Sequence, residues 1–149
     1  MMPAVFTILL IDDDATIADL LTRAAATTFP EAVFVHSSTY DQAAGYLGDL
    51  TGRGPRLILL DINLRTGLSG FDFLSLVRQH PQGHLVPIIM LSASDDSADR
   101  GEAYRRGATV YSQKPFSFQA WKRYVASLRA YWFETVTLPA IWFQQEDAT

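Results

Sequence analysis

The stretch VFTILLIDDDATIADL, residues 5–20, places a short apolar run directly before three consecutive aspartates. The run, residues 5–11, is typical of a strand that is buried on both faces. Adjacent carboxylates repel one another, and partial burial adds to the cost unless a cation joins them. The position of Asp12, Asp13 and Asp14 at the end of a buried strand therefore indicates a functional site.

Four more short apolar runs follow along the chain. They occupy residues 32–37, 56–61, 86–92 and 108–114. The segments between them predict helices with one buried face, because apolar residues recur there at intervals of three and four, as at Ile17, Leu20, Leu21 and Ala24. A strand followed by a helix, five times over, is typical of a parallel sheet covered by helices on both faces. The sequence thus predicts an α/β, doubly wound fold with a five-stranded parallel sheet.

The composition narrows the class of protein. The chain has 149 residues, of which 48% are hydrophobic and 19% are charged, as expected for one globular domain. A net charge of −4 argues against nucleic acid as the main partner. There is no cysteine, which excludes disulfides and thiolate metal sites. The first apolar run is too short to span a bilayer, so we expect a soluble, cytoplasmic protein with no membrane contact.

Polar side chains stand at the ends of four predicted strands. Asp12 and Asp13 follow the first, Asp61 ends the third, Ser92 the fourth and Lys114 the fifth. In an open parallel sheet these ends line one crevice. Three carboxylates gathered there suit Mg²⁺, and an aspartate beside Mg²⁺ can attack phosphorus to give an acyl phosphate. An ammonium and a hydroxyl group would then meet the added phosphoryl oxygens.

These motifs, in this order, resemble the receiver domains of two-component response regulators, which have CheY-like topology with strand order 2-1-3-4-5. Besides the acidic pair, the matching pieces are LLDINL around Asp61, LSAS with Ser92 and YSQKPF with Lys114. The resemblance covers about residues 5–130. It implies a stand-alone, Mg²⁺-dependent phosphoacceptor that works in a phosphorelay.

The resemblance also implies a role for each acidic-site residue. Asp61 would accept a phosphoryl group from a phosphohistidine on a sensor histidine kinase. Asp13 and Asp61 would ligate Mg²⁺, the carbonyl group of Asn63 would complete the protein ligands, and Asp12 would act through a bound water.

The other matching positions imply a switch. Ser92 and Tyr111 resemble the pair in which the hydroxyl group moves toward the phosphoryl group and the aromatic ring rotates inward. Lys114 would pair with the phosphoryl group, and the face formed by the fourth helix, the fifth strand and the fifth helix would repack. A cis bond is common in the family at the place of Lys114–Pro115, and the resemblance extends that expectation to this chain.

The chain departs from the family pattern beside Asp61. Arg65 stands where the family usually has proline, and Gly70 comes nine residues after Asp61 instead of eight. We therefore expect the loop over residues 65–70 to be one residue longer. Asn63 and Ser94 occupy places that tune dephosphorylation in the family, so the class alone does not predict the phosphoryl lifetime.

Several polar segments have simpler interpretations. Asp14 is expected to cap the first helix, with a role in metal binding as the alternative. His36, His80 and His84 show no ligand spacing and are interpreted as surface or loop histidines. The predicted fourth helix, residues 97–106, is the least apolar of the five, which suits either a face that shifts or an ordinary solvated helix.

The predicted receiver domain, residues 1–130, precedes an extension, residues 131–149, that is too short for a DNA-binding or enzymatic output domain. Its aromatic and β-branched residues would form a large exposed apolar patch, so we expect another surface to bury them. Packing onto the same domain is one possibility; a homodimer through the fourth helix, the fifth helix and the extension is the prediction, with Trp121, Trp132, Phe133, Val136 and Leu138 as candidates. The run WFETVTLP also resembles the extension of small response regulators that partner bacterial and cyanobacterial phytochromes, which implies a phytochrome-type kinase as partner.

A rival interpretation is a Mg²⁺-dependent phosphohydrolase with an aspartyl-phosphate intermediate. Such enzymes usually carry a second aspartate two residues after the nucleophile, and here that position is Asn63. An interaction module that never takes phosphate is a third interpretation, weakened by the presence of every site residue. We expect no turnover of a separate substrate.

Overall fold

Strands and helices alternate along the chain, as the sequence predicts. The computed structural model describes residues 4–64, 67–93 and 95–144. The strands are β1 (Phe6–Ile11), β2 (Ala32–Ser37), β3 (Leu57–Asp61), β4 (Ile88–Ser92) and β5 (Val110–Gln113). The helices are α1 (Ala15–Thr28), α2 (Tyr40–Gly48), α3 (Gly70–Gln79), α4 (Ser97–Arg105) and α5 (Phe118–Leu128). Within the described ranges, no helix combines the length and apolar character that a bilayer crossing requires.

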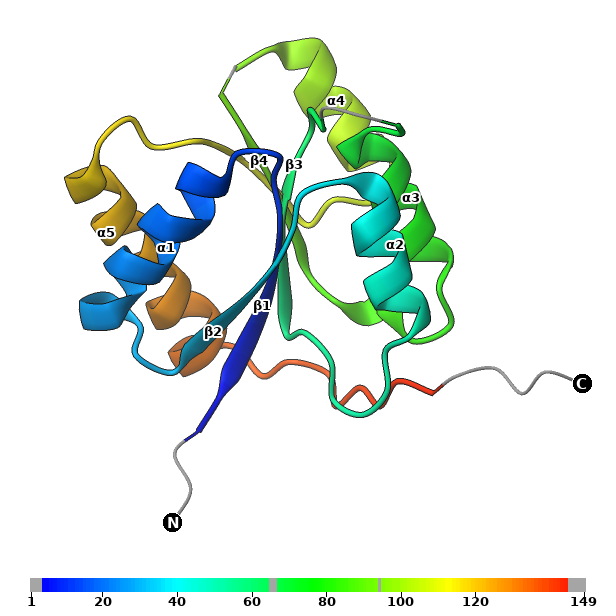
Figure 1. The fold of residues 1–149 in the computed structure, drawn as a ribbon, viewed down its shortest axis with the longest axis horizontal. Coiled ribbons are helices and arrows are strands. Elements are labelled where there is room, and N and C mark those ends of the chain that lie inside the picture. Colours follow the sequence, from blue (N-terminus) through cyan, green and yellow to red (C-terminus); the bar gives the residue numbers. More distant parts are fainter. Residues whose placement is uncertain (1–3, 65–66, 94, 145–149) are drawn as a thin grey trace, which may run out of the picture.

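The five strands form one parallel sheet in the order β2-β1-β3-β4-β5, which confirms the predicted fold class. Helices α1 and α5 lie on one face of the sheet, and α2, α3 and α4 lie on the other (Figure 1). Alternate residues of a strand serve the two faces. In β1, Leu9 and Ile11 pack toward α2 and α3, whereas Ile8 and Leu10 pack toward α1 and α5. The central strands are therefore apolar almost throughout.

Helix α1 begins beside the acidic cluster. Its cap residue, Asp14, accepts a hydrogen bond from the backbone N–H of Thr16 at 2.9 Å, which confirms the predicted cap. The carboxylate satisfies a backbone donor that has no partner inside the helix. The third aspartate of the run thus serves the helix.

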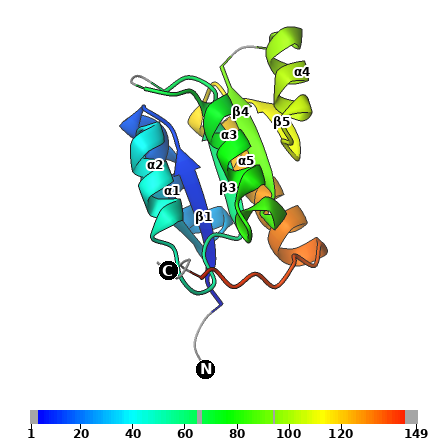
Figure 2. The same cartoon turned by 90° about the vertical axis from the view of Figure 1, so that its right-hand side faces the viewer.

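Helix α4 packs beside β5, at the outer edge of the sheet (Figure 2). Ala103 is its one buried residue among those described. The hydroxyl group of Tyr104 accepts a hydrogen bond from the backbone N–H of Tyr111 at 3.1 Å. Beyond the helix, Arg106 lies 3.6 Å from a carboxylate oxygen of Asp72 on α3. These few contacts suit both interpretations of α4, a helix that shifts and an ordinary solvated helix.

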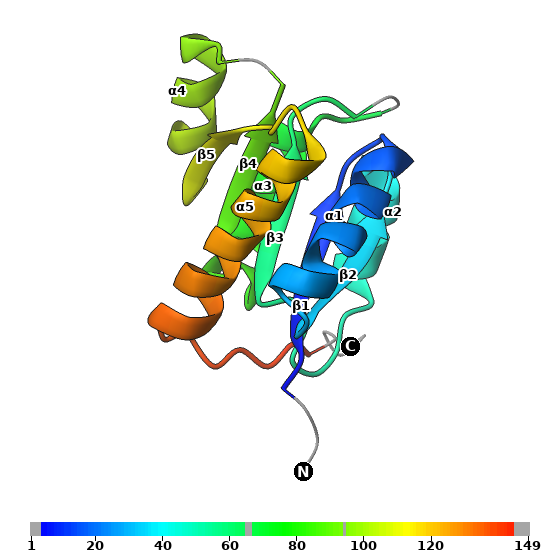
Figure 3. The ribbon, with the colours of Figure 1, turned by 90° about the vertical axis from the view of Figure 1, so that its left-hand side faces the viewer.

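The chain beyond α5 packs back onto its own domain. Helix α5 ends at Leu128, and the chain continues as a π-helix, Arg129–Thr135, from which Trp132 and Phe133 pack against the core. Trp132 is buried, and the ring of Phe133 lies 5.9 Å from that of Phe6. The chain then runs beneath the sheet (Figure 3), where Phe143 is buried. All five residues proposed for a dimer are at least partly buried within the single chain: Trp121, Trp132, Phe133, Val136 and Leu138.

Candidate functional site

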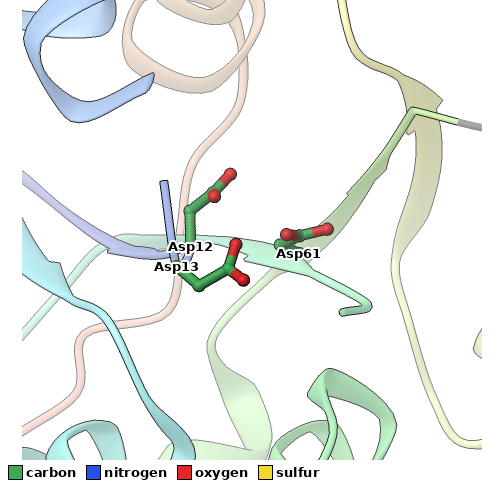
Figure 4. Close-up of side chains that lie close together, drawn as sticks. All are labelled: Asp12, Asp13 and Asp61. Atoms are coloured by element: carbon green, nitrogen blue, oxygen red, sulfur yellow. The ribbon is translucent and has the colours of Figure 1, made fainter. Parts of the chain in front are cut away.

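Three carboxylates meet at the carboxyl-terminal edge of the sheet. Asp12 and Asp13 follow β1, Asp61 ends the neighbouring β3, and one oxygen from each lies within 4.8 Å of the others (Figure 4). Asp12 and Asp61 are buried, and Asp13 is half-buried. Parallel neighbours end at the same edge of a sheet, so the fold itself produces the cluster that the sequence predicts.

Hydrogen bonds hold the turn after β1 in place. The backbone N–H of Asp12 donates to the carbonyl group of Ser37 at 3.1 Å, and the N–H of Asp14 donates to the Asp12 carboxylate at 2.9 Å. His36 on β2 lies with Nε2 2.8 Å from the carbonyl oxygen of Asp12. A carbonyl oxygen only accepts, so Nε2 carries the proton.

His36 is a residue whose contribution the sequence did not reveal. Interpreted as a surface or loop histidine, it instead lies half-buried in β2, opposite Leu10 in the strand register. Its bond to the carbonyl group of Asp12 orients the peptide that leads to Asp13. The spacing of 24 residues carries no signal for this contact, because it depends on how two strands align.

Replacing His36 by phenylalanine is expected to weaken Mg²⁺ binding about tenfold, because groups that orient metal ligands contribute on that scale. His36→Gln, which can still donate to the Asp12 carbonyl group, should retain more of the affinity. Calorimetric titration with MgCl₂ measures both. His84→Phe is the matched control, since His84 contacts the His80 carbonyl group far from the cluster in the fold. Equal affinities for wild type and His36→Phe would show that the contact does not position the site.

Gly70 brings the start of α3 directly against Asp61. Its backbone N–H donates to the carbonyl group of Ile62 at 2.8 Å. A Cβ atom at this position would lie 2.0 Å from the carbonyl oxygen of Asp61, so only glycine fits. The family's glycine therefore has its counterpart at Gly70. Arg65, at the family's proline position, lies outside the described residues.

Lys114 supplies the positive charge at the site. Its Nζ lies 2.8 Å from Asp12 and 3.4 Å from Asp61. Its backbone N–H donates to the carbonyl group of Ser92 at 2.7 Å, which ties β5 to β4 at this edge. The expected cis bond between Lys114 and Pro115 is wrong, because the described residues contain no cis peptide bond. The trans form is the more stable one by about 0.5–1 kcal/mol, and it already lets the amine reach both carboxylates.

The other predicted site residues come from β4, from β5 and from the segment after β3. Ser92 is buried at the end of β4, next to β3. Asn63 is exposed, with its backbone N–H 3.4 Å from an oxygen of Asp61. Tyr111 is half-buried in β5. Ser94 lies outside the described residues.

Burial controls the ionisation of the site. It raises the pKa of Asp61 to about 6, the negative charge of Asp12 adds to the rise, and Lys114 offsets only part of it. Burial alone would lower the pKa of Lys114, but its hydrogen bond to Asp12 and the charge of Asp61 more than offset this and raise it. A divalent cation would relieve the repulsion among the carboxylates. The residues present fit Mg²⁺, which favours carboxylate oxygens.

The raised pKa of Asp61 makes stability depend on pH. The folded protein holds this proton up to a pKa of about 6, whereas the unfolded chain releases it near the ordinary value of 3.8. The stabilising contribution is therefore complete below the unfolded value and is lost as pH rises through the folded one. We expect the metal-free protein to lose on the order of 2–3 kcal/mol of unfolding free energy from this group between about pH 4 and pH 7.

Urea denaturation in EDTA across this pH range measures the loss. Asp61→Asn, which cannot ionise, should show a flatter pH dependence than wild type. Asp19→Asn is the control, because Asp19 is an exposed carboxylate on α1 that pairs with Arg23. The same slope for wild type and Asp61→Asn would contradict the expectation.

Comparison with known proteins agrees with this geometry. The protein-family model for the response regulator receiver domain matches residues 8–126 of this chain. The probable methanogenesis regulatory protein FilR2 of Methanothrix harundinacea is 31% identical over 134 residues, covering 85% of this chain and 83% of FilR2.

Two solved structures share the fold over almost their whole length. The phosphorylated cyanobacterial phytochrome response regulator RcpA has a TM-score of 0.82 and 25% identity, with 91% of this chain and 99% of RcpA covered. The Mn²⁺-bound form of Rcp1, a response regulator of Synechocystis sp., has a TM-score of 0.76 and 26% identity at the same coverage. In direct sequence comparison the match to Rcp1 is 33% identical and spans 58% of each chain. The topology, the acidic cluster with its lysine, and the family match over residues 8–126 together show that this chain belongs to the response regulator receiver domain family.

Proposed function

We propose that the chain is a single-domain response regulator that accepts a phosphoryl group on Asp61 from a sensor histidine kinase. The observation that carries the proposal is the meeting of three carboxylates with the Lys114 amine at one sheet edge. In the transfer, a carboxylate oxygen of Asp61 forms a bond to phosphorus. The bond between phosphorus and the kinase imidazole nitrogen breaks, and its electron pair leaves with the imidazole.

Mg²⁺ is the proposed cofactor. Asp12, Asp13 and Asp61, with the carbonyl group of Asn63, would hold it, and Asp12 would do so through a water. When bound, the ion lowers the charge repulsion between the carboxylates and the incoming phosphoryl group. The Mn²⁺-bound form of the similar protein Rcp1 supports a divalent cation here.

The added phosphoryl group changes the partners of two side chains. Lys114 would exchange part of its contact with Asp61 for a phosphoryl oxygen, and the Ser92 hydroxyl group would donate to another. The ring of Tyr111 would then move inward. The phosphoryl group adds about two negative charges, which is enough to shift a surface that can adopt two conformations. The few contacts of α4 favour a change in the surface formed by α4, β5 and α5.

A phytochrome-type sensor histidine kinase is the proposed partner. The similarity to RcpA, a cyanobacterial phytochrome response regulator, supports this assignment. We further propose a receiver domain, residues 1–130, and an extension, residues 131–149, that together with α4 and α5 forms a homodimer through the surfaces that packing of the extension onto its own domain leaves exposed. Sizing the protein with and without beryllofluoride tests the dimer. A monomer under both conditions would exclude it.

Transfer of labelled phosphoryl groups tests the relay. A phosphorylated phytochrome-type kinase should pass label to the wild-type protein in Mg²⁺ and pass none in EDTA. Faster transfer from this kinase than from an unrelated sensor kinase supports the partnership, whereas equal rates contradict it. Release of phosphate from small phosphoesters would instead favour a hydrolase. Receiver domains are typically signalling proteins, so we expect no such release.

A further inference from the structure

A cleft lies at the opposite end of the sheet from the acidic cluster. The chain after α5 passes the loop between α2 and β3 at this end of the sheet (Figures 1 and 3), and residues of both segments line the cleft. The cleft has a volume of about 440 Å³. Arg53 and Arg56 line it from the loop, and Leu138, Pro139, Ile141 and Trp142 line it from the tail.

The two walls of the cleft are fixed to each other. Gly52 and Phe143 exchange two backbone hydrogen bonds, at 3.0 and 2.7 Å. The Phe143 ring is buried beneath them, and a Cβ atom at Gly54 would lie 2.5 Å from it. Gly54 also has a φ of +63°, which glycine adopts without strain. Loop and tail thus form a preformed cleft.

The described lining of the cleft is positively charged, whereas the protein as a whole is negatively charged. The chain carries a net charge of −4, yet the described lining of the cleft has two guanidinium groups and no acidic side chain. Among the described residues, neither Arg53 nor Arg56 lies within ion-pair distance of a carboxylate, in contrast to Arg129, which pairs with Glu31 at 2.7 Å. Arg56 is instead held over the ring of Phe6, at 5.9 Å from its centre. The two arginines are therefore available to an anion.

The tail adds a planar aromatic group beside these charges. Trp142 is 63% exposed, although Trp121 and Trp132 are buried. Arginine binds phosphate or carboxylate with paired N–H groups, and an exposed indole offers a face for a flat ring. The volume lies in the range of small-molecule sites and is too small for a folded element of another protein.

We infer that this cleft binds a small aromatic anion of the nucleoside monophosphate class. The phosphate meets Arg53 and Arg56, and the base lies against Trp142 and the apolar residues of the tail. Because the cleft and the acidic cluster are at opposite ends of the strands, the two sites can be occupied together. The inference is independent of phosphoryl transfer to Asp61.

Adenosine 5′-monophosphate is the probe, titrated in EDTA so that the acidic cluster holds no metal to bind phosphate. Trp142 is the exposed tryptophan, so its fluorescence should change and saturate. Adenosine without the phosphate, and inorganic phosphate without the base, should each bind at least about tenfold more weakly, because each lacks one half of the contacts. Calorimetry gives the same affinities without relying on the tryptophan.

Variants locate the ligand. Arg53→Gln and Arg56→Gln should each weaken binding of the nucleotide about tenfold, and Trp142→Leu should weaken it by a similar factor in calorimetry. Arg23→Gln on α1 is the matched control and should bind as wild type does. Asp61→Asn should also bind normally, which separates this test from the one for phosphoryl transfer.

Several results would overturn the inference. No saturable binding at millimolar nucleotide would remove the site. Inorganic phosphate that binds as well as the nucleotide would reduce it to a plain anion site, and adenosine that does so would reduce it to an apolar groove. An equal loss of affinity in Arg23→Gln would place the nucleotide elsewhere on the surface.

Discussion

The Asp61→Asn variant is expected to take up no phosphoryl group from acetyl phosphate in Mg²⁺. The amide keeps the shape of the side chain but lacks the negative oxygen that attacks phosphorus. The fold should remain, because the change removes a buried charge whose pKa is already raised by burial and by Asp12. The mass of the intact protein reports the adduct, and circular dichroism reports the fold.

The control for this loss is Asp19→Asn, which removes an exposed carboxylate on α1 and should be labelled as wild type is. Labelling of Asp61→Asn to the wild-type level would take the role of acceptor away from Asp61. Loss of label in both variants would point to a general effect of charge.

Removal of the lysine charge is expected to have the second largest effect. Lys114→Met leaves Asp12 and Asp61 buried without their cation, and breaking such a pair typically costs about 3–5 kcal/mol. We expect the lower end of this range, because the lysine side chain is partly exposed. For a domain of this size, each kcal/mol lowers the melting temperature by about 2–4 °C. Thermal denaturation in EDTA at neutral pH measures the change.

Added Mg²⁺ should recover much of this stability, because the ion replaces the missing positive charge between the carboxylates. Lys122→Met on α5 is the matched control, since Lys122 lies over the ring of Phe118 and contacts no carboxylate among the described residues. A Lys114→Met protein as stable as wild type in EDTA would mean that the ion pairs with Asp12 and Asp61 do not offset their burial.

The parts of the fold that follow from local pattern were predictable. Apolar runs located all five strands, and the parallel arrangement forced Asp12, Asp13 and Asp61 to the same edge of the sheet. The cap at Asp14 was also predictable, because a helix start needs an acceptor at that point. Lys114 followed from its place after the last strand.

The parts that depend on contacts between distant segments were not predictable. The bond from His36 to the Asp12 carbonyl group requires the register of β1 against β2. Burial of Phe143 requires the tail to reach a loop some 90 residues earlier in the chain, at Gly52. A tail rich in aromatic and β-branched residues indicates only that some surface buries it. Its own domain and a second molecule offer the same apolar chemistry, so composition alone did not separate them.

The contact between Tyr104 and Tyr111 has a consequence for solubility. Strand β5 is at the edge of the sheet, and an exposed edge strand can recruit a strand from another molecule and start aggregation. The Tyr104 hydroxyl group accepts from the Tyr111 N–H and so covers one donor on that edge. A shift of α4, as we propose for the phosphorylated protein, would uncover this donor and open the edge of the sheet to strand pairing with another molecule.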